Sequence, residues 1–127
     1  MKTRLAHNGF TLIELLVVLA IIGSLLTIAV PSYFATLDNS RETALRQSLS
    51  VMRDAIDHYR GDVGKYPDSL QDLVTRRYLR NIPSDPITGA ADAWVVEAPT
   101  DAGAGAVRDV RSGAPGNGRD GTAYGTW

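Results

Sequence analysis

The amino-acid sequence predicts an α+β protein in which one long N-terminal helix packs on a small antiparallel β hairpin or sheet. An apolar block runs from Phe10 to Val30, apolar residues recur at helical spacing between Ser32 and Arg60, and two short β-favouring runs follow. The chain has 127 residues and a net charge of −1. It can therefore hold one modest soluble domain, and its charge gives no reason to expect a nucleic-acid partner.

The residue composition argues against an enzyme. Cysteine is absent, and His7 and His58 are the only histidines. The chain therefore cannot form disulfides, thiolate metal sites or a multi-histidine metal centre. Its scattered aspartates show no spacing typical of an acid–base pair, and no run carries a nucleophile beside a base. We therefore expect a protein without catalytic residues and without a cofactor, apart from the calcium question considered below.

The apolar block from Phe10 to Val30 is long enough to cross a bilayer. Its 21 residues would span about 30 Å as a helix, which is the thickness of the hydrocarbon core. Lys2 and Arg4 precede it without an acidic residue, so the positive-inside rule predicts a cytoplasmic N-terminus. A cleaved signal peptide and a plain single-pass anchor are alternatives, but the block is longer than a signal-peptide core and continues towards Pro31.

Two residues in or next to this block are unusual for a membrane helix. Glu14 is the only formal charge in the block, and an acidic side chain there costs about 2.5 kcal/mol or more. It therefore predicts a cationic partner, the alternative being a carboxylate tolerated near the cytoplasmic interface. Pro31 cannot donate a helical N–H, so we expect a kink there, the alternative being a simple membrane-exit boundary.

Residues 9–18, GFTLIELLVV, resemble the processing site of type IV pilins and pseudopilins. A short basic leader, the glycine, the phenylalanine, the glutamate and the apolar run all occur in register. The resemblance implies that a prepilin peptidase cuts after Gly9 on the cytoplasmic side and methylates the new amine of Phe10. It also implies that Glu14 pairs with the Phe10 amine of a neighbouring subunit, which recovers part of the cost of burying the carboxylate.

The region after Pro31 is predicted to begin with an amphipathic helix over residues 32–60. Its charged residues include an opposite-charge pair, Glu42 and Arg46, at i, i+4 spacing. We expect these charged faces to be solvated. The core face carries Leu45, Leu49, Met52, Ile56 and Tyr59, and the other faces carry Asp38, Arg41, Glu42, Arg46, Arg53, Asp54, Asp57 and Arg60.

Three smaller elements are expected after this helix. A short helix over residues 69–78 begins with a capping box formed by Ser69 and Asp72. The β region, residues 93–111, forms a hairpin from the runs 93–98 and 107–111. A C-terminal loop, residues 112–127, completes the chain. The short helix also carries the basic residues Arg76, Arg77 and Arg80, which we interpret as a solvated helix end rather than a DNA contact.

The soluble region also resembles the major (G-type) pseudopilins of type II secretion systems and their relatives. The resemblance is carried by Gly64-Lys65-Tyr66-Pro67, by Asp85-Pro86, by the strand with Trp94, and by the glycine-rich end at Trp127. It implies a structural subunit that polymerises with its own copies and with minor pseudopilins into a periplasmic filament. An inner-membrane secretion platform would drive this pseudopilus to export proteins.

The resemblance also implies a division of the chain along a bacterial inner membrane. Residues 1–9 would be the cytoplasmic prepilin leader, residues 10–30 the transmembrane and assembly helix, and residues 31–127 the periplasmic domain. Two alternatives stay open at this point. One is a minor type IV pilin for adhesion, motility or DNA uptake, and the other is a membrane-tethered domain that does not polymerise.

The C-terminal loop departs from the pattern of the family it resembles. Major pseudopilins typically close with a calcium-binding loop rich in acidic oxygens, whereas acidic positions are taken here by Pro115 and Tyr124. Calcium prefers about six to eight oxygen ligands. Asp120 is the one carboxylate of this loop, and Asn117 adds an amide oxygen. These two residues are weak calcium candidates, and the alternative is a metal-free loop held by packing of Tyr124 and Trp127.

Overall fold

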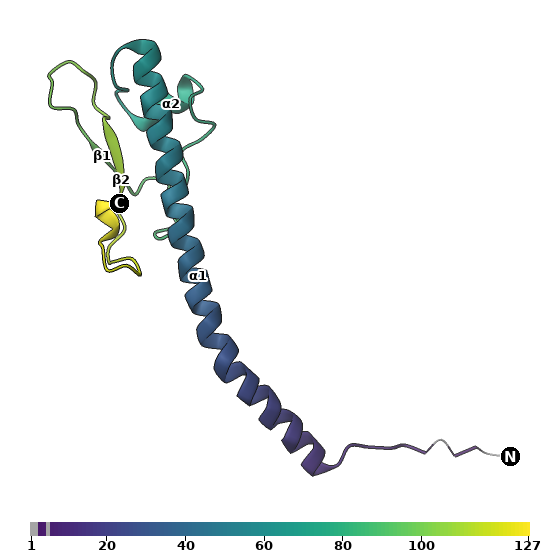
Figure 1. The fold of residues 1–127 in the computed structure, drawn as a ribbon. Coiled ribbons are helices and arrows are strands. Elements are labelled where there is room, and N and C mark those ends of the chain that lie inside the picture. The colour runs from purple at the N-terminus through teal and green to yellow at the C-terminus, as the bar shows by residue number, and fades with distance from the viewer. Residues whose placement is uncertain (1–2, 5) are drawn as a thin grey trace. The chain divides into compact units, whose positions relative to one another are not determined.

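The computed structural model describes residues 3–4 and 6–127. Lys2, which contributes to the predicted orientation of the N-terminus, lies outside the described residues. The chain divides into a first compact unit that ends at Leu37 and a second unit from Asp38 to Trp127. The described elements (Figure 1) are the helices α1 (Leu12–Val63) and α2 (Leu70–Thr75), the strands β1 (Trp94–Glu97) and β2 (Asp109–Ser112), and the 3-10 helix η1 (Tyr124–Thr126).

α1 is a single helix of 52 residues that continues through Pro31. It belongs to both units because the boundary between them falls after Leu37. The expected long N-terminal helix is therefore confirmed, while the kink at Pro31 stays a prediction. Its start differs from the prediction, since helix begins at Leu12 and not at Phe10. The cause is local, because the side chain of Thr11 accepts an N–H of the first turn.

The C-terminal end of α1 also differs from the predicted boundary at residue 60. Gly61 is still helical, and α1 ends at Val63. Gly64 has a φ of 84°, a left-handed conformation that glycine adopts without steric cost. Its N–H still donates to the carbonyl of Arg60 at 2.9 Å. Gly64 is therefore the residue that terminates the helix.

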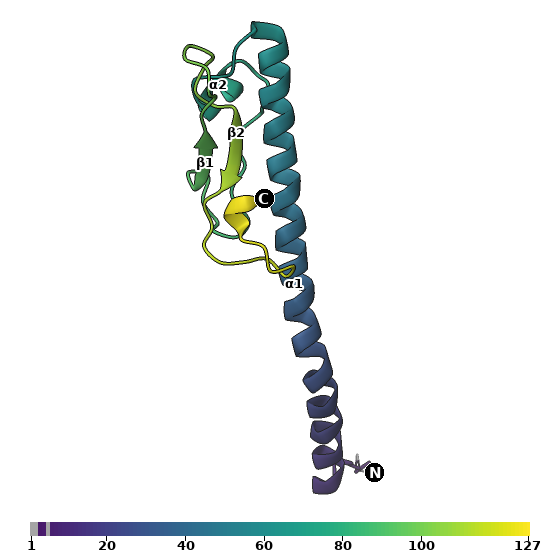
Figure 2. The same ribbon diagram turned by 60° about the vertical axis from the view of Figure 1, so that its left-hand side comes forward.

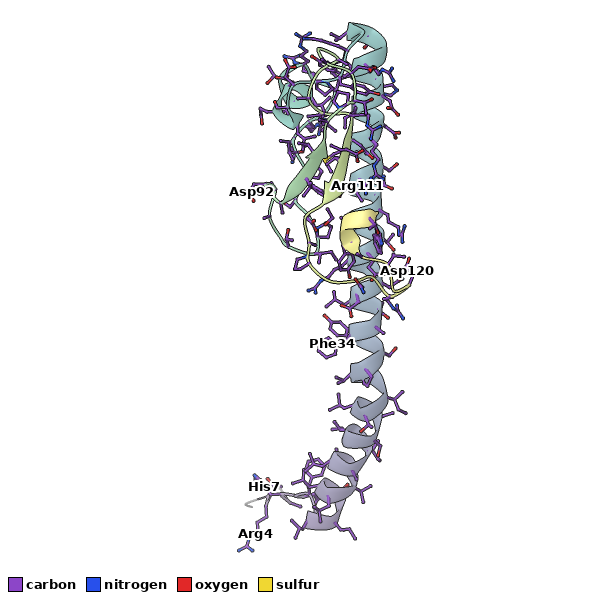
Figure 3. All side chains as sticks on the ribbon, turned by 90° about the vertical axis from the view of Figure 1, so that its left-hand side faces the viewer. Arg4, His7, Phe34, Asp92, Arg111 and Asp120 are labelled. Carbon is purple, nitrogen blue, oxygen red and sulfur yellow. The ribbon has the colours of Figure 1, made fainter. Side chains whose placement is uncertain are left out.

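The part of α1 in the first unit is apolar and exposed to its surroundings. Its most apolar stretch has no buried residue, and its length and composition suffice to cross a membrane. Figure 3 shows the side chains of this part, including Phe34, projecting outwards from the helix. An exposed surface of this kind is unfavourable in water, so this part of α1 is suited to a membrane anchor.

The hydrophobic core of the second unit lies between α1 and the residues that follow it. The predicted core face of α1 is confirmed, since each of its five residues is at most 2% exposed. Leu73 of α2, Trp94 of β1 and Val110 of β2 pack against this face. The buried residues that α1 contributes are Leu45, Leu49, Met52, Ala55, Ile56 and Tyr59.

α2 is shorter than predicted, because it ends at Thr75 and not near residue 78. The expected N-cap is present, with Ser69 Oγ accepting the N–H of Asp72 at 3.3 Å. Arg77 then takes a φ of 64°, and the N–H of Tyr78 donates back to the carbonyl of Leu73 at 2.8 Å. This is the hydrogen bonding of a Schellman motif, which stops the helix at a left-handed residue.

The predicted hairpin is confirmed, with corrected strand ends. β1 pairs antiparallel with β2 in a register that joins Trp94 to Ser112 and Glu97 to Asp109. Both Figures 1 and 2 show the strands beside the second half of α1. The first strand is shorter than residues 93–98. The second begins at residue 109 because the N–H of Val107 donates to the carbonyl of Pro67 at 2.9 Å instead of joining the ladder.

Candidate functional site

The predicted processing site lies in an exposed segment before α1. The described residues from Ala6 to Thr11 form neither helix nor strand, and Gly9 and Phe10 are exposed. A Cβ on Gly9 would meet no other atom within 4 Å. Figure 3 shows Arg4 and His7 in the same segment. A peptidase can reach such a segment without unfolding the helix that follows it.

Glu14 forms a capping box with Thr11 at the start of α1. The N–H of Glu14 donates to Thr11 Oγ1 at 3.2 Å, and the N–H of Thr11 donates to Glu14 Oε2 at 3.4 Å. Two N–H groups of the first turn are satisfied in this way. The pattern Thr-x-x-Glu is a sequence signature of a helix start, although a capping box was predicted only at Ser69 and Asp72.

The hydroxyl groups of the apolar part of α1 are satisfied within the helix. Ser24 Oγ donates to the carbonyl of Ala20 at 2.8 Å, and Thr27 Oγ1 donates to the carbonyl of Gly23 at 2.9 Å. Hydroxyls bonded in this way can face lipid without an unsatisfied donor. Glu14 is the only formal charge between Phe10 and Val30. An acidic side chain in lipid is unfavourable unless it has a partner.

The C-terminal loop is held by charged side chains of α1 that we expected to be solvated. Glu42 is the first of these. Its Oε1 accepts the N–H of Arg119 at 2.8 Å and the hydroxyl of Tyr124 at 3.3 Å. Burial and, secondly, the Glu42 carboxylate raise the pKa of Tyr124 above its usual value. Tyr124 therefore stays protonated and keeps donating to Glu42 at neutral pH.

Arg46 contacts two parts of the loop at once. Its Nη2 lies 3.4 Å from Asp120 Oδ2, and its guanidinium carbon lies 3.8 Å from the centre of the Trp127 ring. The first contact is an ion pair and the second is a cation–π contact. The expected i, i+4 pair with Glu42 is thus replaced by contacts to the loop, because both side chains find partners there.

Arg53 joins α1 to β2 and to the end of the described chain. Its Nε donates to Asp109 Oδ1 at 2.9 Å. Its Nη2 donates to the carbonyl of Val110 at 2.9 Å and to the main-chain oxygen of Trp127 at 2.6 Å. The planar guanidinium can reach all three acceptors because its donors point in fixed, divergent directions.

Hydrogen bonds inside the loop connect Asp120 to Trp127 through Thr122. Thr122 Oγ1 donates to Asp120 Oδ1 at 2.6 Å, and the Thr122 N–H donates to the same oxygen at 3.0 Å. Trp127 Nε1 donates to Thr122 Oγ1 at 2.6 Å. The bonds from Thr122 lower the pKa of Asp120, with a smaller contribution from Arg46. Figure 3 shows Asp120 in this loop next to α1.

The oxygen atoms around Asp120 do not fit a calcium site. Its Oδ1 already accepts two hydrogen bonds from Thr122, and its Oδ2 faces Arg46. Asn117 forms an isolated antiparallel β-bridge with Ala123 through its main chain. Among residues 3–4 and 6–127, no group of three or more histidine, cysteine, aspartate or glutamate side chains gathers as a metal site would require. Tyr124 packs on Trp127 in this loop, with ring centres 5.1 Å apart.

Asp85, which carries part of the family resemblance but was given no structural role from the sequence, is a buried acidic residue that contacts the end of β2. Asp85 is fully buried and Ser112 is 2% exposed. Ser112 Oγ donates to Asp85 Oδ2 at 2.5 Å, and Asp85 Oδ1 accepts the N–H of Ile87 at 2.8 Å. The pair joins the loop before β1 to the end of β2. Its burial points to a structural role.

Comparison with known proteins agrees with the geometry of the N-terminal segment. Residues 4–30 match the family described as the prokaryotic N-terminal methylation motif. This range contains the exposed Gly9 and Phe10 and the capped Glu14. The chain also resembles the type IV major alpha-pilin of Moraxella bovis, with 44% identity over 52 residues, or 41% of this chain and 33% of that pilin.

Longer matches connect the chain to one group of proteins. It is 29% identical over 102 residues to type II secretion system core protein G of Klebsiella michiganensis, covering 68% of this chain and 72% of the relative. It is 30% identical over 96 residues to the protein of the same name in Klebsiella pneumoniae, covering 63% and 69%. No solved structure matches the chain significantly. The chain therefore belongs to the type II secretion system core protein G family, within the superfamily of type IV pilins and pseudopilins.

Proposed function

We propose that this protein is a structural subunit of a type II secretion pseudopilus that works by polymerising. The observation that carries this proposal is the methylation motif at residues 4–30 in a chain whose longer matches are core protein G of type II secretion systems. Such a subunit requires both an exposed apolar helical segment and a small folded unit, because the apolar segment can pass from lipid into a filament.

In this proposal a prepilin peptidase removes residues 1–9 and methylates the amine of Phe10. Residues 10–30 hold the subunit in the bacterial inner membrane, with the leader in the cytoplasm and residues 31–127 in the periplasm. The partners are other copies of the chain, minor pseudopilins and an inner-membrane secretion platform. The protein has no enzymatic activity of its own in this account.

Glu14 directs the assembly step in this proposal. Its carboxylate leaves lipid by pairing with the methylated amine of Phe10 in a neighbouring subunit. A buried carboxylate without a cation is strongly unfavourable, so a subunit is stable in the filament only in the register that forms the pair. The capping box with Thr11 holds Glu14 in the first turn of α1, at the N-terminal end of the helix.

Deletion of the gene in the native bacterium, followed by complementation, tests this proposal. We expect deletion to abolish export of proteins by type II secretion and to leave surface pili intact. Intact export together with lost surface pili would instead favour a minor type IV pilin, the alternative that the match to the Moraxella pilin supports.

Cross-linking separates polymerisation from simple tethering. Because the chain has no cysteine, single cysteines introduced between Leu12 and Val30 report only contacts between subunits. We expect oxidation of these single-cysteine variants to yield covalent dimers. A cysteine at the exposed His58 is the control for random collision, and equal cross-linking at both places would contradict the filament.

A further inference from the structure

The C-terminal loop of this protein contacts a positively charged side chain of α1, Arg46. The resemblance to major pseudopilins implies a loop closed by calcium, in which one cation joins acidic oxygens. Here the carboxylate of the loop, Asp120, already has a cation of the protein, since Arg46 lies 3.4 Å away. We propose that the guanidinium of Arg46 takes the place of the calcium ion, so that this loop closes without metal.

The geometry of Arg46 goes beyond a chance surface ion pair. Its guanidinium faces the Trp127 ring at 3.8 Å while it approaches Asp120, so it joins two positions of the loop to one helix. Arginine suits this role because its flat cation stacks on aromatic rings and donates at its edges. Gly118 leaves room for the ring, since a Cβ there would lie 2.2 Å from Trp127 Cζ2.

Two further residues of α1 support the same closure. Glu42 accepts from the main chain of Arg119, and Arg53 donates to the main-chain oxygen of Trp127. Residues 42, 46 and 53 lie on one face of α1, because their spacings of four and seven residues are close to whole helical turns. The loop is therefore anchored near its middle and at residue 127 by one row of side chains.

This arrangement opposes calcium at Asp120 in two ways. A calcium ion would have to displace both hydrogen bonds from Thr122 or approach the oxygen that faces Arg46. In the second case it would lie close to a positive charge, and the repulsion between them would offset its attraction to one carboxylate. The inference goes beyond the proposed function, because assembly through Phe10 and Glu14 makes no demand on the chemistry of this loop.

Hydrogen exchange of the full-length protein in detergent micelles tests the inference. The amide hydrogens of residues 113–127 are followed by mass spectrometry in 2 mM calcium chloride and in 2 mM EGTA. We expect the wild-type rates to agree within about twofold between the two solutions. Arg46→Gln should raise the rates of this segment about tenfold in both solutions, because the cation and the ring contact are lost together.

Arg41→Gln is the matched control, since Arg41 is an exposed arginine of the same helix, and it should leave the loop unchanged. Wild-type exchange that rises about tenfold in EGTA and recovers in calcium would overturn the inference. Normal exchange in Arg46→Gln would overturn it as well. Neither result depends on secretion or on filaments, so failure of this inference is distinguishable from failure of the proposed function.

Discussion

Thr11 and Glu14 satisfy each other's main-chain N–H groups at the start of α1, with hydrogen bonds of 3.2 and 3.4 Å. Glu14 uses Oε2 for this purpose, and a carboxylate has lone pairs for further donors. The same side chain can therefore cap its own helix and bind an amine of another subunit. Cleavage after Gly9 would leave the capping box intact, because both of its residues lie in the mature chain.

Glu14→Gln separates these two roles. Glutamine serves in a capping box as well as glutamate does, so the helix start should survive, but the charge is lost. We expect normal membrane insertion and processing, together with a filament yield that falls at least tenfold. The yield is measured by sedimentation of sheared filaments, and insertion is measured by membrane fractionation.

Thr11→Ala is the control for this experiment, because it removes the capping hydroxyl and keeps the charge. It should cost about 1 kcal/mol of helix stability and should leave the filament yield within about twofold of wild type. If Thr11→Ala abolished assembly while Glu14→Gln assembled normally, the carboxylate would be needed for capping alone.

Arg77→Gly should stabilise the second unit. Arg77 adopts a φ of 64° at the end of α2, where a side chain is strained and glycine is not. We expect the free energy of unfolding to rise by about 0.5–1 kcal/mol, allowing for the greater freedom of glycine in the unfolded chain. Thermal unfolding of the purified protein measures the change. Arg80→Gly, at an exposed residue without a positive φ, should lower stability by a similar amount.

Ser112→Ala should destabilise the hairpin, because it leaves Asp85 Oδ2 without its buried donor. The expected loss is about 1–3 kcal/mol of unfolding free energy, the usual cost of an unsatisfied buried group. Ser84→Ala, at an exposed serine one residue from Asp85, should change stability by less than about 0.5 kcal/mol. Equal effects of the two changes would show that the buried hydrogen bond contributes little.

Acid should release the C-terminal loop. The hydrogen bonds from Thr122 hold the pKa of Asp120 below its ordinary value of 3.8. A depressed pKa means that the carboxylate stabilises the folded loop above pH 3.8 and that this contribution is lost as the pH falls through the lower, folded-state pKa. An NMR titration of the Asp120 carboxyl carbon should give a midpoint below 3.8. Thr122→Val should move the midpoint upwards, whereas Thr122→Ser should retain it.

The elements with a strong periodic signal were predictable from the sequence. The core face of α1 follows the 3.6-residue repeat, and residues such as Leu45 and Met52 are buried as expected. The boundaries were less predictable, because they depend on local hydrogen bonds. Arginine is not a typical residue for a left-handed helix end, so nothing in the sequence indicated that α2 would stop before Arg77.

The contacts of the C-terminal loop were not predictable from periodicity. Glu42, Arg46 and Arg53 lie beside the core face and resemble ordinary solvated charges in sequence. Their partners are 56 to 82 residues away in the chain, and only the fold brings them together. The capping box at Thr11 is different, because its spacing was visible in the sequence and would have placed the start of α1 correctly.

Mass spectrometry of the protein purified from its native membrane tests the central claim most directly. The proposed function predicts a mature chain that begins with methylated Phe10, because it places cleavage after Gly9 and methylation of the new amine before assembly. A Gly9→Val variant, which replaces the residue before the expected cleavage point, should retain its leader and fail to assemble. A wild-type protein that keeps Met1 in cells with active prepilin peptidase would contradict the account and leave a membrane-tethered domain.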